Sequence, residues 1–120
     1  VHVRGGDIVG PGRAFFERAL VRMEKERPGL RYLVFTNDKE AAKEALEGEH
    51  TERKMTYISE LGAFSDVDEF FLMAACRHQI ISNSSYSTWA AYLNPNPEKV
   101  VIMPEYKGCE QIRLKEWIVL

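Results

Sequence analysis

Short apolar stretches rich in β-branched residues alternate along this chain with amphipathic helical stretches, and this alternation limits the folds that the chain can adopt. Parallel strands need crossover connections, and the helices in those connections cover both faces of the sheet. The pattern therefore predicts a parallel, doubly wound α/β sheet. We expect strands at 1–3, 30–36, 54–58, 78–82 and 99–103, and helices at about 13–27, 38–46, 66–77, 85–93 and 110–120.

Polar clusters follow three of the expected strands. They comprise residues 4–7 (RGGD) after the first strand, 36–38 (TND) after the second and 82–85 (SNSS) after the fourth. Ligands of such sheets bind outside the carboxyl ends of the strands. We therefore expect the three clusters to share one edge of the sheet and to form a ligand site there.

The size and charge of the chain limit the class of protein to which it can belong. Its 120 residues suffice for one core, so we expect a single domain over 1–120. The hydrophobic share of 45% and the charged share of 28% are typical of folded globular domains. A formal net charge of −2, with basic and acidic residues spread along the chain, offers no positive face to nucleic acid.

Nothing in these residues anchors the chain in a membrane, since no run approaches the roughly 18 apolar residues of a spanning helix. Cys76 and Cys109 form no CxxC motif and are weak evidence for a disulfide framework. The chain begins at Val1, within an apolar stretch, so we expect a fragment. We expect a cytoplasmic protein of bacterial type, or one of the Golgi lumen if a missing amino-terminal segment carries an anchor.

Two of the polar clusters suit an anion. Arg4, with glycines behind it, can direct a guanidinium and backbone N–H groups at phosphate oxygens, although a surface arginine beside a turn is the alternative. The run 82–87 (SNSSYS) brings hydroxyl groups to the start of a helix, where free N–H groups also suit an anion; simple N-capping is the alternative. Neither GxGxxG nor GxxxxGK[ST] appears, so dinucleotide-binding and P-loop chemistry lose support.

The evidence for a metal is weaker. Asp66 and Asp68 form a DxD pattern, whose two carboxylates could hold a divalent cation against a nucleotide diphosphate. Both also stand at a helix start, where aspartates favour the positive end of the helix dipole. His2, His50 and His78 are scattered without metal-ligand spacing. We expect no metal site and keep a metal-dependent transferase as an alternative.

The clusters together carry a resemblance to a known family. Residues 1–7 (VHVRGGD) resemble the HxRRGD motif of α-1,2-fucosyltransferases, and residues 82–93 (SNSSYSTWAAYL) resemble their SNSSFSWWAAWL motif. Between them, 34–38 (VFTND) resembles the VFSDD segment of that family, and 68–82 resembles the segment that leads into its serine motif. The resemblance covers nearly the whole chain.

The resemblance implies the carboxy-terminal, donor-binding half of a GT-B glycosyltransferase, with a Rossmann-like fold. The amino-terminal acceptor domain would lie outside this chain. The implied reaction is the inverting transfer of fucose from GDP-fucose to a galactose hydroxyl of a glycan acceptor, in α-1,2 linkage. The donor would be held without a metal or another cofactor.

The resemblance also implies roles for individual residues. Arg4 would contact the donor phosphates and support the departure of GDP. Asp7 is a candidate catalytic base, with a structural role in the turn as the alternative. His2 would lie beside the nucleotide, and Asp68 would receive guanine N–H groups. The other expected donor-binding residues are Asp38, Asn83, Ser84, Ser85 and Tyr86.

Two departures from the family pattern matter. Gly5 stands in place of the second arginine of HxRRGD, and Thr88 replaces the first tryptophan of the WW pair. A charge-assisted hydrogen bond to phosphate is worth roughly 1.5–3 kcal/mol, so the missing arginine weakens donor binding without preventing it. A non-catalytic module that binds a nucleotide sugar or glycan is therefore the alternative function.

Overall fold

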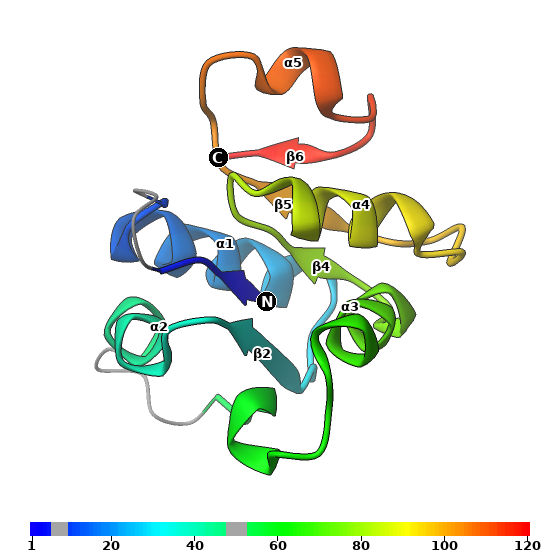
Figure 1. The fold of residues 1–120 in the computed structure, drawn as a ribbon. Coiled ribbons are helices and arrows are strands. Elements are labelled where there is room, and N and C mark those ends of the chain that lie inside the picture. Colours follow the sequence, from blue (N-terminus) through cyan, green and yellow to red (C-terminus); the bar gives the residue numbers. More distant parts are fainter. Residues whose placement is uncertain (6–9, 48–52) are drawn as a thin grey trace.

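The computed structural model describes residues 1–5, 10–47 and 53–120, and the chain in those ranges alternates between strands and helices (Figure 1). This alternation confirms the predicted α/β class. The strands are β1 (His2–Val3), β2 (Tyr32–Thr36), β3 (Met55–Tyr57), β4 (Gln79–Ile80), β5 (Val101–Met103) and β6 (Ile118–Val119). The helices are α1 (Arg13–Glu26), α2 (Lys39–Leu46), α3 (Asp66–Ala75), α4 (Ser85–Leu93) and α5 (Cys109–Ile112), with a 3-10 turn, η1 (Ile58–Leu61), after β3.

Every strand pairing in the described ranges is parallel, as predicted. The strands form two three-stranded sheets, ordered β3-β2-β1 and β4-β5-β6, which meet at β1 and β4 (Figure 1). Val3 of β1 and Ile80 of β4 belong to one core cluster, and His2 Nδ1 hydrogen-bonds Ser82 Oγ at 2.8 Å. The resulting sequence β3-β2-β1-β4-β5-β6 is the Rossmann order, with its reversal between β1 and β4.

The side chains of the strands alternate between two helical layers. Val34 packs in a cluster with buried residues of α1 and α2, whereas the next residue, Phe35, packs in a cluster with α3 and α4. Ile80 and Ile81 divide in the same way, because successive residues of a strand point to opposite faces. Helices therefore cover both faces of the strands, which is the doubly wound arrangement.

The helices begin and end where the local chemistry predicts. Asp38 caps α2 by accepting a hydrogen bond from Ala41 N, and Ser65 forms a capping box with Asp68 at the start of α3. Ser84 caps α4 by accepting from Tyr86 N. After α1 the chain turns at Gly29, whose φ of 80° lies in the left-handed region that favours glycine.

The tail differs from the prediction. The helix expected over 110–120 is wrong, since α5 ends at Ile112 and β6 then pairs in parallel with β5. Trp117 is buried and stacks on Tyr92 at a centroid distance of 5.0 Å, which draws the tail onto α4 and β5. This long-range packing decides between strand and helix in a short apolar run whose periodicity is ambiguous.

Among the described residues, no helix has the length and the apolar character that crossing a membrane requires.

Neighbouring positions on α1 test this packing. We expect Leu20→Ala to lower the free energy of unfolding by about 2–5 kcal/mol, because Leu20 is 1% exposed and the surrounding core cannot close the cavity. Val21 is 55% exposed, so Val21→Ala should change it by less than about 0.5 kcal/mol. Urea denaturation measures both values, and equal effects would contradict the buried face of α1.

Candidate functional site

A cavity of about 420 Å³ opens at the carboxyl edge of the strands. It lies where the ends of β1 and β2 meet the first turns of α3 and α4. Its lining contains a cation, two carboxylates and three rings: His2, Arg4, Phe35, Thr36, Asn37, Asp66, Glu69 and Tyr86. We call it the carboxyl-edge cavity.

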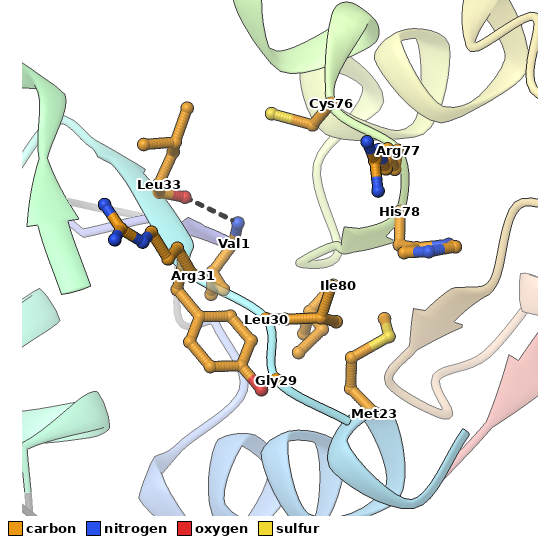
Figure 2. Close-up of a pocket in the computed structure, with 11 residues that line it drawn as sticks. Val1, Met23, Gly29, Leu30, Arg31, Leu33, Cys76, Arg77, His78 and Ile80 are labelled. Carbon is orange, nitrogen blue, oxygen red and sulfur yellow. Dashed lines mark hydrogen bonds between the residues drawn. The ribbon is translucent and has the colours of Figure 1, made fainter. Parts of the chain in front are cut away.

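A second cavity, of about 430 Å³, lies at the opposite edge of the strands (Figure 2). Val1 and Leu33, joined by a hydrogen bond of 2.8 Å, lie on one side of it, and Cys76 and His78 lie on the other. None of the residues predicted for the site lines it. Because ligands of parallel α/β sheets bind at the carboxyl ends of strands, the carboxyl-edge cavity is the candidate site.

Arg4 follows β1 directly and brings a positive charge to this cavity. Its Nε atom is buried and makes no hydrogen bond to any residue that the structure describes. A buried guanidinium nitrogen that lacks a protein partner is ready to donate to an anion. The short β1 strand, paired with β2 through His2↔Phe35 and Val3↔Thr36, determines where Arg4 emerges.

The loop after β4 lies beside the loop that carries Arg4. A Cβ atom built on Gly10 would stand 3.1 Å from Arg4 O and 3.7 Å from Asn83 Oδ1, so Gly10 lies between the two loops. His2 reinforces this approach through Ser82 and through a ring contact with Tyr86 at 5.4 Å. The two clusters that the sequence analysis assigned to one edge are therefore neighbours.

His2 is buried at 7% exposure where the two sheets meet. Burial, together with the nearby Arg4 guanidinium, lowers the pKa of His2 to about 3. The imidazole is therefore neutral near pH 7. It can support the site through hydrogen bonding and ring packing, without a positive charge of its own.

The residues of the serine motif have different roles: one caps helix α4 and another lines the carboxyl-edge cavity. Ser84 is buried and serves as the N-cap of α4, its Oγ accepting from Tyr86 N at 3.2 Å. Ser85 is exposed, and of the motif residues predicted to bind donor only Tyr86 lines the carboxyl-edge cavity. Tyr86 OH donates to Asp66 O at 3.0 Å, which ties the start of α4 to the start of α3.

Two predicted acidic residues also serve as helix caps. Asp38 Oδ1 accepts from Ala41 N at 3.1 Å, and Asp68 Oδ2 accepts from Ser65 N at 3.2 Å. Neither side chain lines the carboxyl-edge cavity. Asp7, the candidate base, lies outside the described residues.

Glu69 is a lining residue that the sequence analysis missed, and Asp66 was considered there as a metal ligand or a helix-start residue, not as part of a ligand cavity. They are three positions apart on α3, so they share a face of the helix; this i,i+3 spacing was the available signal. Burial, then the charge of Asp66, raises the pKa of Glu69. Burial raises the pKa of Tyr86 as well, followed by the charges of Glu69 and Asp66.

The DxD pattern does not converge on the cavity, since Asp66 lines it and Asp68 does not. Side chains two positions apart on a helix point in different directions. Within the described ranges, no group of three or more histidine, cysteine or acidic residues is placed to hold a metal ion.

The chemical character of the cavity follows from these contacts. Arg4 offers an anion site, Asp66 and Glu69 offer hydrogen-bond acceptors, and the ring of Tyr86 contacts His2 and Phe70. Such a lining suits an elongated ligand that combines an anionic group, a flat ring and N–H donors.

The His2 shift predicts a pH effect on stability. His2 takes up a proton near pH 6.5 in the unfolded chain but only near pH 3 in the folded chain. The contribution of His2 to the free energy of unfolding is therefore complete above pH 6.5 and decreases as the pH falls below that value. We expect a loss of up to about 2 kcal/mol from this group between pH 7 and 5. His2→Asn keeps a hydrogen-bonding side chain that does not titrate. Denaturant curves of the variant should fall less steeply over that interval, and parallel curves would contradict the assignment.

Comparisons with known proteins identify the family of the chain. The family model described as glycosyl transferase family 11 matches residues 1–120. The chain is also 29% identical over 116 residues to the O-antigen biosynthesis glycosyltransferase WbnK of Escherichia coli, a match that covers 87% of this chain and 37% of WbnK. The chain thus spans just over a third of that relative, and no solved structure matches it significantly. With a parallel α/β fold and a family match over its whole length, this chain belongs to glycosyl transferase family 11.

Proposed function

We propose that this chain binds GDP-fucose in the carboxyl-edge cavity, and that the protein transfers fucose with inversion to a galactose hydroxyl of a glycan, in α-1,2 linkage. Membership of glycosyl transferase family 11 supports a sugar transferase with a nucleotide-sugar donor and a glycan acceptor. The observation that carries the choice of donor is the lining itself, with Arg4 and the Glu69 carboxylate in one cavity.

Arg4 is the proposed phosphate ligand. Its buried Nε has no partner among the described residues, and a diphosphate oxygen would supply the missing acceptor. Charge grows on the GDP oxygen as the glycosidic bond breaks, so a guanidinium held there stabilises the transition state more than the ground state. The loop of Asn83, beside Gly10 and Arg4, is the second proposed phosphate contact.

Glu69 is the proposed acceptor of guanine N–H groups. We favour it over Asp68 because Glu69 lines the cavity, whereas the Asp68 carboxylate is engaged in the capping box of α3. The N1–H and 2-amino groups of guanine are adjacent donors that a single carboxylate can accept together. Adenine lacks this pair of donors, so Glu69 would discriminate against it.

The proposed reaction is a single displacement. The acceptor hydroxyl oxygen attacks the anomeric carbon of fucose, the bond from that carbon to the phosphate oxygen breaks, and GDP leaves. The hydroxyl proton passes to a base. Asp7 remains the proposed base, with a structural role in its turn as the alternative. The name of WbnK suggests an O-antigen glycan as the class of acceptor.

The Arg4 assignment predicts a loss of affinity on its removal. We expect Arg4→Ala to weaken GDP binding about ten- to hundredfold, since a charge-assisted hydrogen bond is worth roughly 1.5–3 kcal/mol. Arg18→Ala is the matched control, because Arg18 is exposed on α1 and does not line the carboxyl-edge cavity. Isothermal titration with GDP, GDP-fucose and UDP gives the affinities. If the unmodified protein binds none of the three ligands, the proposed function is refuted.

A matched pair on α3 tests base recognition. We expect Glu69→Gln to weaken GDP binding about tenfold while leaving ADP binding unchanged, because the carboxylate acceptor is lost. Asp68→Asn removes a carboxylate one position away, outside the cavity lining. It should leave GDP affinity within about twofold, while it lowers stability by about 0.5–1 kcal/mol through the weakened cap. Titration calorimetry measures the GDP affinity of both variants. A larger loss in Asp68→Asn than in Glu69→Gln would assign the guanine contact to Asp68.

A non-catalytic binding module is the second candidate function, and the environment of Gly5 favours it. A Cβ atom at this position would lie 2.4 Å from Asp38 Cβ, so the described backbone leaves no room for the second arginine of the family motif. Release of GDP from GDP-fucose by the intact protein with a β-galactoside separates the two functions. Tight donor binding without any release would support the binding module.

A further inference from the structure

The backbone next to Arg4 is held by one side-chain amide. Gly5 N donates to Asn37 Oδ1 at 2.8 Å, and Asn37 Nδ2 donates to Gly5 O at 3.3 Å. The amide thus satisfies both backbone groups of the residue that follows Arg4. A carboxylate could accept the first of these bonds but could not donate the second.

Hydrogen bonds hold the segment after β2 in place where it approaches Gly5. Thr36 Oγ1 bonds both the N–H and the carbonyl of Asp38 at 3.0 Å, and the Asp38 carboxylate caps α2. Asp38 therefore cannot retreat easily from Gly5, where an added Cβ would come within 2.4 Å of it. The absence of a side chain at position 5 lets the two strand ends approach closely enough for the Asn37 amide to bridge them.

These two positions also correspond to charged residues in the family motifs that the chain resembles. Gly5 stands at the second arginine of HxRRGD, and Asn37 stands at the first aspartate of VFSDD. A positive charge and a negative charge of the family motifs are both missing here, at two positions that are hydrogen-bonded to each other. The hydrogen-bonded pair is neutral in this chain and leaves Arg4 beside an uncharged clamp.

We propose that Asn37 is a positioning residue for Arg4, which sets the direction of the guanidinium while adding no charge to the cavity. The proposal rests on the proposed function of Arg4 as the diphosphate ligand. Arg4 Nε has no hydrogen bond to the described residues, whereas the backbone one residue further on is held by two hydrogen bonds with Asn37, which fix the position from which the Arg4 side chain starts. Both Arg4 and Asn37 line the carboxyl-edge cavity, and an aspartate at position 37 would compete with phosphate for the guanidinium.

The test compares Asn37→Asp, Asn37→Ala and Asn96→Asp in the intact protein. Asn96 is the matched control because its amide also joins two backbone groups, Arg77 O and Glu98 N, at a loop remote from the cavity lining. Titrations with GDP and with guanosine separate the diphosphate contribution from that of the base. We expect Asn37→Asp to weaken GDP binding at least about tenfold and guanosine binding by less than about twofold. Asn37→Ala should cause a smaller selective loss, and Asn96→Asp none.

Each outcome decides the proposal. Asn37 is exposed, so the variants should fold, and thermal unfolding checks this. Equal losses for GDP and guanosine would show a merely structural role and overturn the proposal. GDP affinity unchanged in Asn37→Asp would also overturn it and leave the proposed function standing. If the unmodified protein binds no GDP, both fail together.

Discussion

The carboxyl-edge cavity depends on how the two three-stranded sheets are joined. The described strands β1 and β4 belong to different sheets, and the buried hydrogen bond from His2 to Ser82 links their ends. Because burial keeps the pKa of His2 near 3, this link is a neutral contact that requires no buried charge. It holds the loop of Arg4 beside the start of α4, so the site exists at the point where strand order reverses.

Several polar side chains at this edge serve the fold before they serve any ligand. Ser84, Asp38 and Asp68 each accept a hydrogen bond from a backbone N–H group at a helix start. Their removal therefore lowers stability as well as changing the site. Glu69 differs, since it has no such capping duty and lines the cavity directly, which is why it is the better candidate for base recognition.

At Gly5, where the family motif has a second arginine, this chain has a backbone held by a side-chain amide. The close approach of Gly5 to Asp38 excludes a second guanidinium, and the Asn37 amide takes over the backbone at that point. In the proposed donor complex a single guanidinium faces the phosphates, so the direction of the Arg4 side chain matters more there than it would beside a second arginine. Under that proposal, the clamp on Gly5 contributes by positioning Arg4 part of what a second charge would contribute by attraction.

The sequence by itself determined the alternation of strands and helices and the family resemblance, because these depend on local periodicity and on residue types at fixed offsets. It also placed the polar clusters at one edge, since parallel strands all end on the same side. Only the tertiary structure decided that residues 118–119 form a strand and that Glu69 rather than Asp68 lines the cavity. Only the tertiary structure showed that the Asn37 amide forms hydrogen bonds with both backbone groups of Gly5. These outcomes depend on contacts between residues far apart in the chain, such as Trp117 on Tyr92, which no local pattern encodes.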